Sequence, residues 1–156
     1  MRYSTEKHTI GIRELTLLLI GLILLLLMAV IAKGQQPIYR EYRGVRLGMT
    51  AEETRAKLGT PVLMSNEQDF YVLSANETTQ IAYDAFQKVV AISTDYTGGV
   101  GAPDYKSVVG EGMLLQRPDG SLFRMEQYHS AGMWVSYNKS AAVVPVVTIT
   151  IQIIRF

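Results

Sequence analysis

The chain has 156 residues, enough for one domain of ordinary size, and 48% of them are apolar. Its 15 Lys and Arg residues nearly balance its 14 Asp and Glu residues, which argues against a nucleic-acid partner, because such partners require a basic surface. The absence of cysteine excludes disulfides, thiol chemistry and metal sites with sulfur ligands.

An apolar run occupies residues 15–32, where no side chain is charged between Glu14 and Lys33. About twenty apolar residues span the hydrocarbon core of a bilayer, so the run predicts a transmembrane helix behind a cytoplasmic tail at residues 1–14. A cleaved secretory signal ending at Ala32 is the alternative, although the run is longer than the usual apolar region of such signals. The prediction is a single-pass membrane protein whose C-terminal domain is exported to the periplasm or the cell exterior.

Two short segments follow the run. Residues 33–38 are polar and predict a tether. Residues 39–46 alternate tyrosines and arginines, a pattern that suits either a first β-strand or a segment at the membrane surface.

A short helix is predicted over residues 51–58. Thr50 and Glu53 have the spacing of a capping box, in which each side chain accepts a hydrogen bond from the other residue's backbone amide. Gly59 and Pro61 favour the end of the helix. The pattern predicts one buried side, with Ala51, Thr54 and Leu58, and one exposed side, with Glu52, Arg55 and Lys57.

Beyond this helix the spacing of apolar residues changes from helical to alternating. Strands rich in β-branched and aromatic residues are predicted at 69–74, 79–84 and 88–95, and their short connections imply antiparallel pairing. A glycine-rich connection, residues 98–103, then ends this first unit, residues 39–97.

The second unit, residues 104–156, repeats the plan loosely. A short helix is predicted to end at Gly110, and the strands that follow are expected at 112–117, 121–127, 132–138 and 146–154. The predicted fold class is therefore α+β. It consists of an N-terminal transmembrane helix and a tandem of units, each a short helix with an antiparallel sheet.

The stretch GVRLGMTAEETRAKLGTP, residues 44–61, resembles the first-helix signature of small exported domains in the SmpA/OmlA and β-lactamase-inhibitor-protein-like group. The resemblance implies helix-plus-sheet units that bind other proteins or the bacterial envelope. Outer-membrane members of the group help β-barrel assembly, and inhibitor members grip an enzyme with two units. The cysteines typical of both kinds of member are absent from this chain. The matching residues are Gly48, Met49, Thr50, Leu58, Gly59 and Pro61.

No catalytic constellation is visible in the sequence. His8 and His129 are the two histidines, and one exported histidine cannot build a multi-histidine metal site. Asp119, His129 and Ser130 could supply a triad, but adjacent residues on a strand point to opposite faces. The sequence therefore predicts no catalytic residue, no metal site and no cofactor, in a protein that is not an enzyme.

The binding prediction rests on aromatic and arginine side chains, because Tyr and Trp are enriched at interface hot spots. Core packing is the alternative for each ring. The predicted function is a membrane-anchored envelope protein that binds protein partners, in the setting of envelope or outer-membrane protein assembly. The alternatives are a small-ligand or lipid-binding module, or a secreted inhibitor-like binder if the N-terminus is cleaved. The candidate partner-binding residues are Tyr39, Arg40, Tyr42, Arg43, Tyr71, Tyr128, Trp134 and Tyr137.

Overall fold

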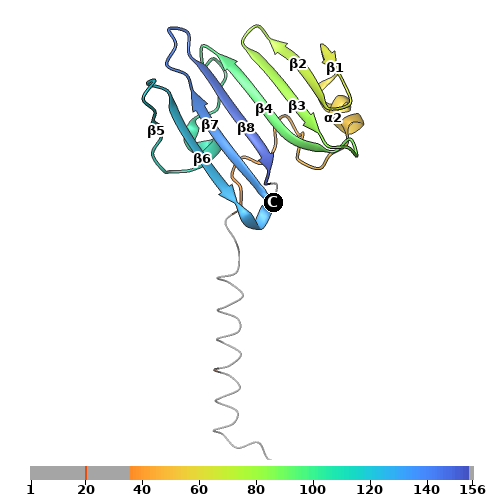
Figure 1. Ribbon diagram of the computed structural model, residues 1–156, viewed down its shortest axis with the longest axis horizontal. Coiled ribbons are helices and arrows are strands. Elements are labelled where there is room, and N and C mark those ends of the chain that lie inside the picture. The colour runs from red at the N-terminus through yellow and green to blue at the C-terminus, as the bar shows by residue number, and fades with distance from the viewer. Residues whose placement is uncertain (1–19, 21–35, 155–156) are drawn as a thin grey trace, which may run out of the picture. The chain divides into compact units, whose positions relative to one another are not determined.

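The computed structural model describes residue 20 and residues 36–154 of the chain. Gln35–Phe156 is one compact unit, in which eight strands form a single antiparallel sheet with the order β1-β2-β3-β4-β8-β7-β6-β5 (Figure 1). The strands are β1 (Leu63–Met64), β2 (Gln68–Ser74), β3 (Glu77–Tyr83), β4 (Val89–Thr97), β5 (Leu115–Gln116), β6 (Leu122–Tyr128), β7 (Met133–Lys139) and β8 (Val146–Ile153).

The predicted fold class, a tandem of helix-plus-sheet units behind a transmembrane helix, is wrong. The strands of both halves belong to one sheet, because β4 pairs with β8 from Ala91–Gln152 to Thr97–Val146. Helix within residues 36–154 is limited to α2 (Ala51–Leu58), α3 (Tyr105–Val109) and the 3-10 turn η1 (His129–Ala131). Alternating sequence patterns identify strands, but they do not report which strands pair across more than fifty residues.

The membrane prediction is corrected as well. The predicted anchor at residues 15–32 and the tail at residues 1–14 lie outside the described residues, apart from Ile20. Among the residues that are described, none belongs to a helix with the length and apolar character needed to cross a bilayer, which contradicts the predicted single-pass topology. The prediction rested on composition alone, and an apolar run of sufficient length does not by itself establish a spanning helix.

The helix predicted at residues 51–58 is confirmed as α2. The Thr50 hydroxyl accepts a hydrogen bond from the Glu53 amide at 3.1 Å, and the Glu53 carboxylate accepts one from the Thr50 amide at 2.7 Å. Gly59 closes the helix with a φ of 85°, a conformation that strongly favours glycine. Ala51 and Thr54 face the interior as expected.

Residues 39–46 do not form the expected first strand. Tyr42 and Val45 instead exchange two backbone hydrogen bonds, of 2.9 and 2.8 Å, across a tight turn. Arg43 and Gly44 occupy the turn with φ values of 48° and 78°. The alternation of tyrosine and arginine suits a strand, but Gly44 permits the chain to reverse where a strand would continue.

One face of the sheet is covered by residues 36–50, α2 and α3, and the first of these segments passes behind the strands in Figure 1. The core on this face includes a row of adjacent side chains across β3, β4, β8 and β7, each at most 1% exposed: Ile81, Ile92, Ile151 and Val135. Tyr42, Val45, Ala51, Val108 and Val109 pack on the sheet from the covering segments.

Two arginines connect the covering segments to the sheet. Arg55 of α2 donates from Nε and Nη2 to the two carboxylate oxygens of Asp69 on β2, at 2.8 and 3.0 Å. Arg124 of β6 donates to the backbone carbonyls of Val109, at the end of α3, and Met113, at 3.3 and 3.1 Å, and it pairs with Glu126. Each half of the sheet thus has a guanidinium that holds the covering chain in place.

The order of strands reads the same from either edge of the sheet. Each half begins with a short helix and a two-residue strand and continues with three longer strands. The pairing of Thr94 with Ile149 lies at the middle of the central β4–β8 ladder. Because of this order, the outermost strands of the two halves, β1 and β5, lie at opposite edges.

Candidate functional site

The second face of the sheet is covered by no element within residues 36–154, and we call it the open face. The strand registers place one row of alternate side chains from each strand on it. Its residues are Leu63, Gln68, Phe70, Val72, Thr78, Gln80, Ala82, Ala91, Ser93, Asp95, Thr97, Leu115, Phe123, Met125, Gln127, Trp134, Ser136, Asn138, Val146, Thr148, Thr150 and Gln152.

The centre of the open face is small and polar. The hydroxyls of Ser93 on β4 and Thr150 on β8 are 3.1 Å apart and share a hydrogen bond. The Thr148 hydroxyl donates to the Asp95 carboxylate at 2.6 Å. These neighbouring side chains form hydrogen bonds with one another across the strands. The centre is therefore polar but carries little charge.

Apolar side chains lie at both edges of the open face. Leu63 of β1 stands opposite Phe70 of β2, and Leu115 of β5 stands opposite Phe123 of β6. Leu63 and Leu115 are each 67% exposed, an unusual state for large apolar residues that occur in matched positions. The Arg117 guanidinium lies 4.1 Å from the centre of the Phe123 ring, which shields that ring in part.

Asp95 is the one charged side chain on the open face, as defined by the strand residues that the structure describes. Charged residues are depleted at the centres of protein interfaces, whereas a solvated sheet face commonly carries Lys and Glu. The chemical character of the open face is therefore that of a contact surface rather than of a solvated one.

The predicted partner-binding residues separate into three groups in the structure. Tyr42, Tyr71, Tyr128 and Tyr137 are buried on the covered face, where their rings pack in the core. This is the core-packing alternative that the sequence left open for each ring. Trp134 lies half-buried on the open face, beside Gln152 and Gln127.

The remaining three candidates lie on the segment that covers the sheet. Arg43 pairs with Glu77 at 2.6 Å, and the Tyr42 hydroxyl donates to the same carboxylate group at 2.7 Å. Tyr39 and Arg40 line an open depression of about 420 Å³ together with Ile38, Glu41 and Arg46. The structure therefore does not bring Tyr39, Arg40 and Arg43 together with Trp134 on one surface.

Sequence reasoning missed the apolar edges of the open face. Phe70 and Phe123 are each flanked by inward-facing residues, so strict alternation could have placed them outside. Leu63 and Leu115 belong to two-residue strands, which are too short for a periodic signal. Pairing across the sheet is what turns these four separated residues into two matched pairs.

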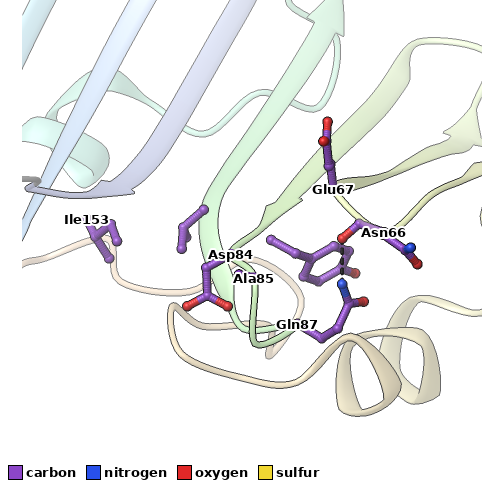
Figure 2. A pocket seen from close by; sticks show the side chains of 8 residues that line it. Asn66, Glu67, Asp84, Ala85, Gln87 and Ile153 are labelled. Atoms are coloured by element: carbon purple, nitrogen blue, oxygen red, sulfur yellow. Dashed lines mark hydrogen bonds between the residues drawn. The ribbon is translucent and has the colours of Figure 1, made fainter.

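A larger pocket of about 920 Å³ lies at the turn between β3 and β4 (Figure 2). Its polar side chains form hydrogen bonds with neighbouring residues of the turns. Asp84 accepts hydrogen bonds from the backbone amides of Phe86 and Lys88, both at 2.9 Å. The Gln87 amide donates to the Asn66 carbonyl, and Figure 2 shows the Glu67 carboxylate directed away from these groups. The pocket is thus a depression between two turns, without a nucleophile placed beside a base.

A buried polar cluster surrounds Asp69 on the covered face. Besides Arg55, its carboxylate accepts hydrogen bonds from the hydroxyls of Tyr83 and Tyr71, at 2.8 and 3.3 Å. Burial, reinforced by the nearby carboxylate, raises the pKa of Tyr71 to about 12 and raises the pKa of Tyr83 as well. The phenols are therefore neutral donors at physiological pH. The Asp69 carboxylate receives its hydrogen bonds from Arg55, Tyr71 and Tyr83, all of which belong to the cluster.

Within the described part of the chain, no three His, Asp or Glu side chains lie close enough together to hold a metal ion. No known family, no characterised protein and no solved structure matches the sequence or the fold. The similarity of residues 44–61 to the SmpA/OmlA group stays a prediction, since none of these comparisons bears on it.

Proposed function

We propose that the sheet domain is a non-catalytic module that binds another protein through its open face. The observation that carries the proposal is the combination of a nearly uncharged polar centre with Leu–Phe pairs at both edges, in which the leucine is exposed and the phenylalanine is half-buried. Interface centres are depleted in charge and enriched in aromatic residues and Met, and the open face carries Trp134 and Met125 as well as the two Phe rings.

The size of the open face also supports a protein partner. Six strands spaced by about 4.8 Å and about seven residues long give roughly 650 Å² per molecule. A complex would therefore bury roughly 1,300 Å² in total, at the lower end of the range for specific protein–protein contacts. A small ligand would leave most of this surface in contact with water.

Photo-crosslinking in the cells that make the protein tests the proposal. A photoreactive amino acid in place of Met125, which is 41% exposed, should give a discrete crosslinked product. The same amino acid in place of Glu52, exposed on α2 and remote from the open face, is the matched control and should give none. Equal products at both positions, or none at Met125 in folded protein, would refute binding through this face.

A further inference from the structure

We infer that the partner of the open face is a second copy of this chain, joined face to face in a two-fold symmetric dimer. The inference rests on the proposed function and names the occupant of the same surface. In such an interface the same patch on both subunits meets itself, so the patch must be compatible with its own copy.

The charge of the open face meets that condition. Among its strand residues the one charged side chain is Asp95, whose carboxylate accepts a hydrogen bond of 2.6 Å from Thr148, and the Arg117 guanidinium lies at one edge over the Phe123 ring. A surface that recognises a different protein usually carries charge complementary to that protein, whereas any dense charge near a two-fold axis would face its own copy and repel it. An open face whose strands carry no Lys or Arg, and whose one nearby guanidinium, that of Arg117, lies at the edge over Phe123, therefore suits self-association.

The arrangement of apolar residues meets the condition as well. The strand order is the same from both edges, so a Leu–Phe pair lies at each edge of the face. Five strand spacings separate β2 from β6, which places the two phenylalanines of these pairs about 24 Å apart. When two such faces stack, the β1 edge of one copy lies against either the β1 edge or the β5 edge of the other. In both orientations an apolar pair therefore meets an apolar pair.

Stacked sheets pack about 10 Å apart with their side chains interdigitated, as in the two layers of a β-sandwich. The small residues at the centre, Ser93 and Thr150, permit that approach and can exchange hydrogen bonds across the interface. The roughly 1,300 Å² buried in this arrangement is compatible with a dimer of modest, micromolar affinity, because polar contacts replace those with water at little net gain.

Single-cysteine crosslinking of the full chain tests the dimer, since the natural sequence contains no cysteine. Gln80→Cys places a thiol on an exposed position next to Ser93, at the centre of the open face. A short bis-maleimide should convert most of this variant to a product of twice the chain mass. Ala56→Cys, exposed on α2, should give at least about fivefold less product under the same conditions, because only random collisions bring it together.

Charge variants then separate a specific dimer from other association. Ser93→Lys added to Gln80→Cys should abolish the product, as should Ser93→Glu, because each places like charges across the interface. Mixing the two variants should restore the product. The pair Leu63→Ser and Leu115→Ser, at exposed positions that do not threaten folding, should reduce it several-fold. The apolar run at residues 15–32 is present in every variant, so differences among them report the sheet face.

The dimer is overturned if the Gln80→Cys chain gives no more product than the Ala56→Cys chain, in variants whose circular dichroism matches the natural protein. It is also overturned if the product forms but neither charge nor the Leu→Ser changes affect it. Either result leaves the proposed function standing, because a photo-crosslink at position 125 to a protein of another mass would still identify a different partner. Absence of both kinds of product would reject the dimer and the proposed function together.

Discussion

The ion pair between Arg55 and Asp69 is expected to be the most sensitive point of the fold. Arg55→Met retains much of the aliphatic stem but removes both hydrogen bonds to the Asp69 carboxylate, whose side chain is 0% exposed. Removal of one partner from a buried pair costs about 3–5 kcal/mol, because the remaining charge is left uncompensated. The Arg55 side chain is 32% exposed and the two tyrosine hydroxyls remain, so we expect the lower end, about 3 kcal/mol.

Urea unfolding of the full chain, followed by circular dichroism, measures this loss. Lys57→Met on the same helix is the matched control and should change the free energy of unfolding by less than about 0.5 kcal/mol, because Lys57 is exposed. In the double variant Arg55→Met with Asp69→Asn, the buried charge is gone, so the combined cost should fall below the sum of the single costs by at least about 1.5 kcal/mol. A strictly additive double variant, or a cost of Arg55→Met below about 1 kcal/mol, would refute the reasoning.

Three further outcomes are expected. The folded protein raises the pKa of Tyr42 and Tyr71 from 10.0 to about 12, mainly by burial, so it favours the neutral phenols. Their contribution to stability is complete below pH 10 and is lost as the pH rises towards 12; urea unfolding at pH 9 and pH 11 should show this, and equal midpoints would contradict it. Gly112→Ala should destabilise by about 1 kcal/mol, because the added Cβ would overlap the Arg124 guanidinium, the flexible end of that side chain, which can move away by leaving its carbonyl partners. The same change in an Arg124→Ala background should cost less than about 0.5 kcal/mol, and thermal unfolding distinguishes the cases. Thr50→Ala removes the capping hydroxyl and should cost about 1 kcal/mol by the same assay; no loss would mean that the Glu53 carboxylate alone secures the start of α2.

Local patterns predicted those elements whose cause is local. The ends of α2 follow from Thr50, Glu53 and Gly59, which act within one turn of the helix. The strand expected at residues 146–154 appears as β8, and its alternate residues Val147, Ile149 and Ile151 are buried on one side. In both cases the residues that decide the structure are neighbours in the sequence.

Features that depend on distant pairing could not be read in the same way. Arg55 was expected on the exposed side of α2, because nothing near it in the sequence shows that Asp69 would be buried fourteen residues later. The union of β4 with β8 joins residues more than fifty positions apart, and it changes two expected units into one sheet. The same long-range order creates the open face, so no single stretch of sequence contains that candidate site.

The two faces of the sheet show why aromatic residues were a poor guide to binding. Tyr71 and Tyr137 were candidates because their rings are large and amphipathic, but the same large rings suit them to the core, where both are buried and the Tyr71 hydroxyl donates to Asp69. The side chain of leucine has no polar group. Leu63 and Leu115 nevertheless lie on the surface, in two-residue strands whose residues are all exposed. An exposed leucine opposite a phenylalanine at both ends of one nearly uncharged face therefore points more directly to a contact surface than any of the buried tyrosines does.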